Sequence, residues 1–397
     1  MKNYLNIKQE LLAEYKNILD YWMKYTLDTE FEGFIGEVNH SNSQVKDSDK
    51  GVVLNSRILW TFASAYNFLK DEEYLVIAKR AYEYLIKYFW DKKYEGVYWN
   101  LTYDGQVLDG RKQIYAQGFA IYGLSEYYKA TNNKEALCYS IKLFQLIENY
   151  SFDEENGGYL EALARNWEPL EDMRLSLKDD NEPKSMNTHL HIIEPYANLY
   201  KVWKDPILKR QIKGLIETFL DKIIDSKTSH FNLFFDMDWS VKSNLISYGH
   251  DIEGAWLLCE AAEVIGDEEL LKRVEEIAIK MIDVTIEEGL ATDGSLLYEK
   301  DLSTNKVETD RHWWVQAEAM VGFVNAWQIS KNNLYLDKMV DIWNFIEEKQ
   351  IDNDGGEWFL RVDNQGEPVK FDEKAGFWKC PYHNTRALME VYNRLVN

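Results

Sequence analysis

Cysteine is scarce in this chain of 397 residues. Only Cys138, Cys259 and Cys380 occur, an odd and widely spaced set. This excludes a disulfide framework and the closely paired cysteines that are typical of a structural metal site. Hydrophobic residues make up 46% of the chain, which is ample material for a large core.

Long hydrophobic runs are also absent. No segment approaches the roughly 18–20 consecutive apolar residues of a membrane span, and residues 1–5 lack the apolar core of a signal peptide. We therefore expect a soluble cytoplasmic protein without a membrane partner.

Basic residues are too few to balance the acidic ones. The chain has 45 Lys and Arg against 67 Asp and Glu, a net charge of −22. Such a charge argues against a nucleic-acid partner or an anionic membrane and favours a neutral or small substrate. Aromatic residues are plentiful at 14%, with 14 Trp and 26 Tyr. They indicate aromatic core packing or a site that stacks on flat apolar faces, such as those of sugars.

Alternating β patterns are missing as well, and the hydrophobic period is helical nearly throughout. A repeat is visible in the polar turns that join successive helices, and a leucine marks the same place in each. The marks are 62, 71, 63 and 65 residues apart, at Leu75, Leu137, Leu208, Leu271 and Leu336. Segments of glycine and aromatic residues recur near 33, 96, 157, 294 and 355 and predict short hairpins or extended loops.

The repeat predicts an all-α fold of twelve helices. Their expected ranges are 7–28, 54–70, 72–89, 113–131, 134–150, 188–204, 206–224, 250–265, 268–288, 313–330, 333–349 and 381–395. The first helix of each middle pair is apolar on more sides and is expected inside, and the second is amphipathic and expected outside. The first and last helices lack partners and can complete each other. We therefore predict an (α/α)6 barrel with six inner and six outer helices, spanning 1–397 as one domain, in preference to an open superhelix.

Chemistry-bearing residues gather near the predicted starts of the inner helices. In a closed ring these starts share one end and converge on one funnel. Five of the seven histidines, all but His40 and His230, lie in these stretches. The stretches are 55–57, 115–117, 187–191, 250–253, 311–314 and 378–383.

The stretch 248–256 is the strongest single signal. His250 and Glu253 are three residues apart at the start of a helix, so they share one face. We expect the Glu253 carboxylate to reach the His250 ring or to share a ligand with it. A histidine held by a carboxylate is the usual equipment of a general acid or base.

Three chemistries fit histidines and carboxylates in a ring. A metal site would draw on His189 or His191 with Glu194, His250 and His383, but no ligand-spaced motif such as HExxH is present. A glycosidase would use two opposed carboxylates, for which Glu253 and Glu318 are candidates. Proton abstraction beside a carbonyl needs acid/base groups and an electrophile. The histidines and Arg57 supply these, and we expect no metal and no cofactor.

The tryptophans of these stretches have different expected places. Trp256 points along an inner helix and is expected to pack in the core and form part of the wall. Trp313 and Trp314 face about 100° apart on a helix, so at most one of them needs to be core. Trp378 lies in a loop before Pro381, where stacking on a ligand is the favoured role.

Together these motifs resemble the N-acylglucosamine 2-epimerase superfamily, and within it the cellobiose 2-epimerases most closely. The family's fold is an (α/α)6 barrel, in agreement with the repeat. The motifs occur in family order, at 55–57, 186–191, 249–253, 312–318 and 378–383.

The resemblance implies cofactor-free epimerisation at C2 of the reducing-end sugar of a β-1,4-linked disaccharide. Cellobiose would become glucosyl-mannose, lactose would become epilactose, and aldose–ketose isomerisation would be a side activity. His250 and His383 would be the acid/base pair, Arg57 would hold the enediolate oxygens, and His191 would assist ring opening. The resemblance also implies that Glu253 and Glu318 orient the imidazoles and bind hydroxyl groups. It implies that Trp313, Trp314 and Trp378 stack on sugar rings and that Tyr115 and Asn187 make polar contacts. We also place Trp256 among the substrate-binding residues.

Other functions remain open at this point. Within the superfamily the alternative is an N-acylglucosamine 2-epimerase or a mannose isomerase. An inverting glycoside hydrolase and a non-catalytic sugar-binding barrel are the alternatives from other classes. We expect a small-molecule partner and a monomer or weak homodimer. The insertion 161–185 is either a lid or a solvated loop.

Overall fold

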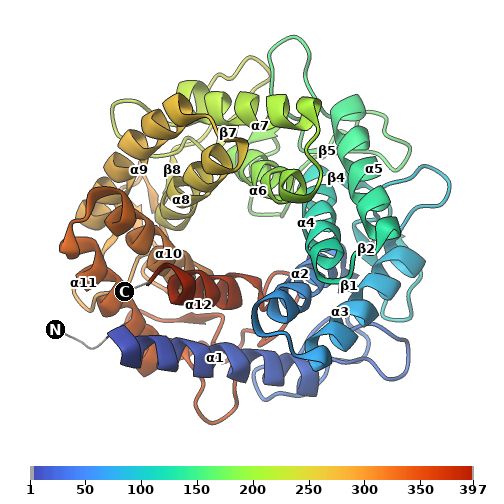
Figure 1. Cartoon of the computed structure of the whole chain (residues 1–397), viewed down its shortest axis with the longest axis horizontal. Helices are drawn as coiled ribbons and strands as arrows, with labels where there is room; N and C mark the ends of the chain where they lie inside the picture. The colour runs from blue at the N-terminus through green and yellow to red at the C-terminus, as the bar shows by residue number, and fades with distance from the viewer. Residues whose placement is uncertain (1–3, 396–397) are drawn as a thin grey trace.

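The structure is a computed structural model that describes residues 4–395. Over this range twelve α-helices form a closed ring (Figure 1). The inner helices are α2 (Val52–Leu69), α4 (Ile114–Thr131), α6 (Met186–Val202), α8 (Tyr248–Ile265), α10 (Trp313–Ser330) and α12 (Tyr382–Arg394). The outer helices are α1 (Tyr4–Tyr25), α3 (Glu72–Tyr84), α5 (Lys134–Tyr150), α7 (Pro206–Thr218), α9 (Glu268–Gly289) and α11 (Asn333–Phe345). The predicted (α/α)6 barrel is confirmed.

The inner helices pack closely because small residues stand where neighbours meet. A Cβ on Gly118 of α4 would lie 2.4 Å from the His191 carbonyl oxygen of α6. On the other side of α4, a Cβ on Gly123 would lie 2.7 Å from the Ser56 carbonyl oxygen of α2. Glycine therefore sets the spacing of three helices that carry site residues.

The first helix closes the ring, as the unpaired chain ends predicted. Outer helix α1 packs against α12, which ends the inner series (Figure 1). Two buried indoles of the last repeat donate to carboxylates of α1: Trp358 Nε1 to Glu14 at 2.9 Å and Trp343 Nε1 to Glu10 at 3.2 Å. In an open superhelix the first and last helices would be far apart and these hydrogen bonds could not form, so that alternative is excluded.

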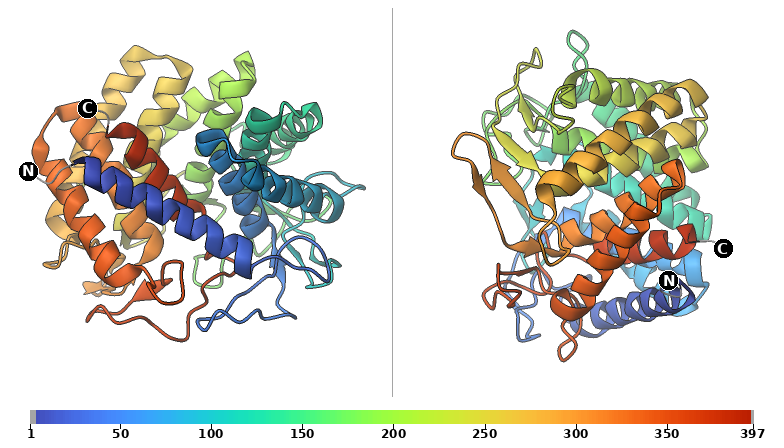
Figure 2. Two further views of the ribbon diagram at one scale, coloured as in Figure 1. Left: turned by 60° about the horizontal axis from the view of Figure 1, so that its bottom comes forward. Right: turned by 90° about the vertical axis from the view of Figure 1, so that its left-hand side faces the viewer.

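Short strands gather at one end of the barrel, opposite the end where α12 finishes (Figure 2). They lie before the inner helices and in the loops that follow the outer helices. Their bounds are β1 (Lys50–Gly51), β2 (Asn100–Leu101), β3 (Val107–Asp109), β4 (Lys112–Gln113), β5 (Ala162–Leu163), β6 (Lys184–Ser185), β7 (Phe234–Phe235), β8 (Leu245–Ser247), β9 (Glu299–Asp301), β10 (Lys306–Val307), β11 (Arg311–His312) and β12 (Arg361–Val362). Five antiparallel pairs, β1–β2, β4–β5, β6–β7, β8–β9 and β11–β12, tie the start of an inner helix to the loop after the next outer helix.

The predicted glycine–aromatic hairpins are confirmed. Antiparallel bridges close each turn, among them Trp90 with Val97 and Phe152 with Tyr159. The bridge between Ile224 and Phe231 closes another turn of this kind. The sequence did not predict that one because its turn contains no glycine.

Ion pairs with a buried cation fasten these hairpins to the inner helices. Lys184 Nζ, fully buried just before α6, donates to Asp153 Oδ2 at 2.7 Å and to the carbonyls of Gly157 and Met237 at 2.8 Å. Equivalent cation–aspartate pairs recur around the ring, in which the aspartate also accepts backbone N–H groups of its own turn. They are Lys50–Asp28 at 2.6 Å, Lys112–Asp91 at 3.2 Å, Arg311–Asp293 at 2.7 Å and Lys374–Asp352 at 2.6 Å.

Helix boundaries differ from the predicted ones by a few residues. Helix α6 begins at 186 instead of 188, because the Ser185 side chain caps it by accepting from Thr188 N. Three outer helices end in a π-helical turn with a bond from residue i+5 to residue i. These turns are η1 (Leu85–Phe89), η2 (Phe219–Ile223) and η3 (Ile346–Gln350). Among the helices of residues 4–395, none combines the length and apolar character that a membrane crossing requires.

Candidate active site

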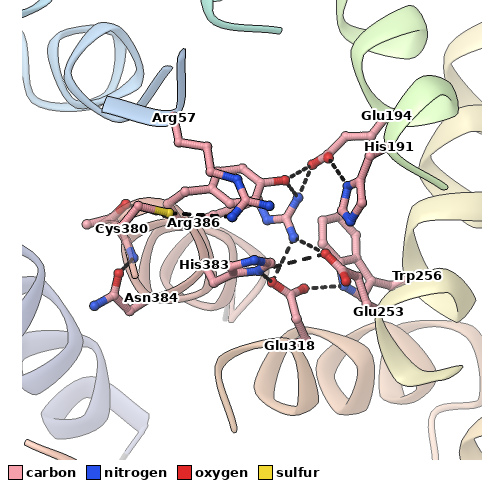
Figure 3. Close-up of polar contacts among 12 residues, drawn as sticks. Arg57, His191, Glu194, Glu253, Trp256, Glu318, Cys380, His383, Asn384 and Arg386 are labelled. Carbon is pink, nitrogen blue, oxygen red and sulfur yellow. Dashed lines mark hydrogen bonds and ion pairs between the residues drawn. The ribbon is translucent and has the colours of Figure 1, made fainter. Parts of the chain in front are cut away.

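The predicted site residues do converge at the strand-bearing end of the barrel. Arg57 comes from α2, His191 from α6, Glu253 from α8, Glu318 from α10 and His383 from α12. Figure 3 shows their side chains directed toward one another inside the ring. The convergence follows from the repeat, because each residue occupies the first turns of an inner helix.

His250 is held by a hydroxyl group. Its Nδ1 lies 2.7 Å from Ser247 Oγ, and its ring packs on Trp314 with centroids 4.7 Å apart. Burial lowers the pKa of His250 to about 4, so the imidazole is neutral near pH 7. The predicted partnership with Glu253 is wrong. The Glu253 side chain turns to Arg386, whose Nη2 donates to its Oε1 at 2.8 Å.

His383 is held by a carboxylate. Its Nδ1 lies 2.6 Å from Glu318 Oε1 and 3.8 Å from Glu253 Oε1. The ring contacts the same Trp314 as His250 does, with centroids 5.7 Å apart. Burial, reinforced by the positive charge of Arg57, lowers the pKa of His383, so this ring is also neutral at rest.

His191 occupies the opposite wall with a carboxylate of its own. Its Nδ1 lies 3.3 Å from Glu194 Oε2, one turn further along α6. Its ring meets Tyr115 and Phe119 of α4 at centroid distances of 4.9 and 5.1 Å. Burial and the nearby charge of Arg57 lower the pKa of His191 as well.

Arg57 brings a cation to the same interior. Its Nη2 donates to the Tyr115 hydroxyl at 2.7 Å, and its Nη1 donates to Cys380 Sγ at 3.6 Å. The guanidinium lies over the Phe119 ring at 4.2 Å. Its Nε–H is buried and has no partner among the described residues, so it is available to a ligand oxygen.

Other buried polar atoms also lack partners within residues 4–395, and Glu253 Oε2, Asn187 Oδ1 and Trp313 Nε1 are among them. A buried polar atom without a hydrogen bond is costly and calls for an explanation. Donors and acceptors left open on several walls of one site suit a ligand with many hydroxyl groups.

The four candidate tryptophans have different places: one supports a site carboxylate from within the core, and the others border the site. Trp256 is 1% exposed, and its Nε1 donates to Glu318 Oε2 at 3.1 Å. It therefore supports Glu318 and offers no face for a sugar, which corrects its expected place as a substrate contact. Trp314 and Trp378 are half-buried, whereas Trp313 is 5% exposed and packs edge-on near His383.

The remaining histidines are engaged elsewhere. Both ring nitrogens of His189 are hydrogen-bonded to the backbone: Nδ1 lies 2.6 Å from Ser185 O, and Nε2 accepts from Tyr159 N at 2.9 Å. It is not available for the metal alternative that included it. His312 stacks on Tyr298 at 4.0 Å, and His230 binds Asp251 at 2.7 Å.

Glu253, Glu318 and His383 lie close enough together to be ligands of one metal ion. The Arg386 guanidinium already lies among them, with Nη2 2.8 Å from Glu253 Oε1 and 2.7 Å from Glu318 Oε1. A fixed cation on the inner lone pairs of both carboxylates opposes a second cation at the same point. The donor set therefore does not suit a resident metal.

Arg386 and Tyr382 are the residues that sequence reasoning missed. Arg386 binds Glu194 as well as Glu253 and Glu318 (Figure 3). The Tyr382 hydroxyl donates to Glu194. A signal was present in the sequence. Arg386 is a charged residue one turn after His383, in a helix whose first seven residues, 382–388, are all buried.

The geometry thus offers three neutral imidazoles, two of them backed by carboxylates, beside a buried guanidinium. Such groups can take a proton from carbon and return it while a cation holds the oxyanion that forms.

Comparisons with known proteins give a consistent result. The family model described as N-acylglucosamine 2-epimerase (GlcNAc 2-epimerase) matches residues 33–387. A cellobiose 2-epimerase of Bacteroides fragilis is 50% identical over 386 residues, which cover 97% of this chain and 98% of that protein. The solved structure of the cellobiose 2-epimerase from Bacillus thermoamylovorans B4167 has a TM-score of 0.94 and 40% identity, with full coverage of both chains. A D-mannose isomerase of Marinomonas mediterranea is 21% identical over 405 residues, covering 98% of each chain.

Proposed function

Because the chain belongs to the N-acylglucosamine 2-epimerase family, we propose that it is a cellobiose 2-epimerase. It inverts C2 of the reducing-end glucose of β-1,4-linked disaccharides without a cofactor. High identity to relatives of that name over nearly the whole chain favours a disaccharide over the monosaccharides of the more distant relatives.

The observation that carries the proposal is the pair His250 and His383. They come from α8 and α12 and pack on one tryptophan, Trp314, at 4.7 and 5.7 Å. Each has its Nδ1 engaged by the protein, through Ser247 and Glu318. The Nε2 of each ring is then left for the substrate.

The proposed reaction begins with the open-chain aldehyde of the reducing-end sugar. One imidazole removes the C2 proton, which converts the sugar to a cis-enediolate. The other imidazole, which has taken a proton from solvent onto Nε2 before this step, delivers it to the opposite face of C2, and the product is the mannose-type epimer. The first imidazole then returns its proton to solvent. Each histidine acts as base in one direction and as acid in the other.

Arg57 and His191 are proposed to serve the oxygens of the intermediate. The Arg57 Nε–H is buried and unpartnered, and it stabilises the charge that develops on the enediolate. His191, which lies against Tyr115, assists opening of the sugar ring. Asn187 and Glu253 contribute hydrogen bonds to hydroxyl groups.

The aromatic walls are proposed to hold the two sugar rings. Trp314 and Trp378 are half-buried and present ring faces, while Trp313 contributes its free Nε1–H. Lactose shares its reducing-end glucose and β-1,4 linkage with cellobiose, so it should yield epilactose. Proton delivery to C1 instead of C2 would give the ketose, and a low aldose–ketose isomerase activity is therefore part of the proposal.

Incubation with cellobiose followed by proton NMR tests the function. New mannose-type anomeric signals at constant disaccharide concentration are expected. Release of free glucose would identify a glycoside hydrolase instead. No change with cellobiose or lactose, but turnover of N-acylglucosamine or mannose, would move the substrate to the monosaccharide alternatives.

The setting of the enzyme is part of the same proposal. All three cysteines are free, which suits the reducing cytoplasm. We propose a cytoplasmic enzyme that is monomeric or weakly dimeric and acts on a small neutral sugar.

A further inference from the structure

We infer that Arg386 is a positioning residue that fixes two of the site's imidazoles, His191 and His383, in the tautomer whose Nε2 is the base. The inference rests on the proposed function only for its kinetic test. Arg386 acts through the carboxylates behind the two rings.

Arg386 is the shared partner of three buried glutamates. Nη1 donates to Glu194 Oε1, and Nη2 donates to Glu253 Oε1 at 2.8 Å and to Glu318 Oε1 at 2.7 Å. The glutamates belong to α6, α8 and α10, so one side chain of α12 ties three other inner helices together (Figure 3).

Two of these glutamates continue to histidines. Glu194 reaches His191 Nδ1 through its second oxygen at 3.3 Å, and Glu318 reaches His383 Nδ1 at 2.6 Å. An ionised carboxylate only accepts hydrogen bonds. Each Nδ1 must then carry the hydrogen, and each Nε2 keeps its lone pair.

The hydrogen-bond pattern says which carboxylates are ionised. Glu318 accepts hydrogen bonds from N–H groups of Arg386, Trp256 and His383. Glu194 accepts hydrogen bonds from Arg386 and from the Tyr382 hydroxyl. Glu253 has one donor and a buried, unpartnered Oε2. Burial raises the pKa of Glu253 to about 8 and raises that of Glu318 as well, so it is the three donors on Glu318, against one on Glu253, that assign the proton to Glu253. Arg386 thus concentrates negative charge on the two carboxylates that hold histidines.

Shape makes the role specific to arginine. The guanidinium is 1% exposed and lies over the rings of Trp256 at 4.8 Å and Tyr382 at 4.3 Å. Its two terminal nitrogens diverge toward opposite sides of the site. A lysine ammonium is one point charge and cannot span Glu194 and Glu318 at once.

Arg386→Lys is the kinetic test, with Arg394→Lys as the matched control. Arg394 lies two turns further along α12 and bonds Glu390, Asn325 and Gln328 without touching a site histidine. Arg386→Lys is expected to lower kcat on the order of 10²-fold, the usual cost of small misplacement, with KM changed less than threefold. The pH below which its kcat/KM falls should rise by at least one unit, because the shorter lysine places its ammonium farther from Glu318 and neutralises that carboxylate less. In Arg394→Lys, kcat/KM should fall at the same acidic pH as in the wild type. The inference would be overturned if kcat/KM of Arg386→Lys fell at the same acidic pH as that of the wild type.

The tautomers themselves give a test that needs neither activity nor a foldable Arg386 variant. Long-range ¹H–¹⁵N correlation spectra of histidine-labelled wild-type protein should show Nδ1–H for His191 and His383. Glu194→Gln offers an NH₂ group to His191 and should convert that ring alone to Nε2–H. Nε2–H at either ring of the wild type would refute the inference. Failure of the wild type to epimerise cellobiose would instead refute the proposed function.

Discussion

At the residue scale, the three site imidazoles differ in the group behind Nδ1. His383 and His191 face carboxylates, whereas His250 faces the Ser247 hydroxyl. A carboxylate stabilises the imidazolium that forms when the ring takes a proton, and a hydroxyl does so far less. The two proposed bases are therefore held by different groups, although burial lowers the pKa of both.

The pH dependence should reveal His250. Burial lowers its pKa to about 4, so the neutral base form persists until the pH falls through that value. We expect kcat/KM for cellobiose to stay nearly constant between pH 7 and pH 5 and to decrease at pH values below 5. Initial rates across pH 4–8, with circular dichroism at each point to confirm folding, measure this. Half-loss near pH 6.5, the value of a free imidazole, would show that an ordinary histidine limits the reaction.

Removal of divalent metals should leave the activity unchanged. Arg386 lies between the two carboxylates that would otherwise be metal ligands beside His383. Dialysis against EDTA, with rates measured before and after, is the check. A large loss that zinc restores would contradict both the acid/base roles and the charge arrangement around Arg386.

At the element scale, the inner helices are positioned from their N-terminal ends. Each of the recurring cation–aspartate pairs, in which the cation is buried, joins the loop that leads into an inner helix to the hairpin after an outer helix. The side chains proposed to be catalytic stand in the turns that follow. We therefore expect the precision of the site to depend on these ion pairs.

Lys184→Met tests this dependence at α6. It leaves Asp153 and two carbonyl groups without their buried donor. Breaking a buried pair costs about 3–5 kcal/mol, and we expect a fall of that size in the free energy of unfolding measured with urea. Lys79→Met is the control, because the Lys79–Glu83 pair is exposed and should change stability by less than about 0.5 kcal/mol. Equal effects of the two substitutions would show that burial of the pair is unimportant.

At the scale of the whole molecule, the repeat was sufficient to predict the barrel. Register leucines and glycine–aromatic hairpins recur because every unit packs the same way, so periodicity in the sequence carries the architecture. The ring then brings Arg57, His191, His250 and His383 together, although they are far apart in the chain. Contacts between side chains of different helices were not predictable, because spacing within one helix says nothing about its neighbours.

The two errors in the site have this common origin. Spacing placed Glu253 beside His250, yet the side chain turns inward because Arg386 of α12 offers a charge. Trp256 was expected to pack in the core and also to form part of the wall, but Glu318 of α10 accepts its N–H and holds it entirely in the core. In both cases the deciding partner comes from another helix.

The central claim is that His250 and His383 serve opposite faces of C2. Hydrogen–deuterium exchange at C2, followed by NMR in D₂O with each epimer supplied to His250→Asn and to His383→Asn, tests it most directly. Each variant should lose net epimerisation on the order of 10²–10⁴-fold, the usual contribution of a positioned acid or base. Each should still exchange the C2 proton of one epimer, and the two variants should prefer opposite epimers. If both variants exchange the same epimer, or if wild-type product formed in D₂O keeps its C2 proton, the two-histidine account is contradicted.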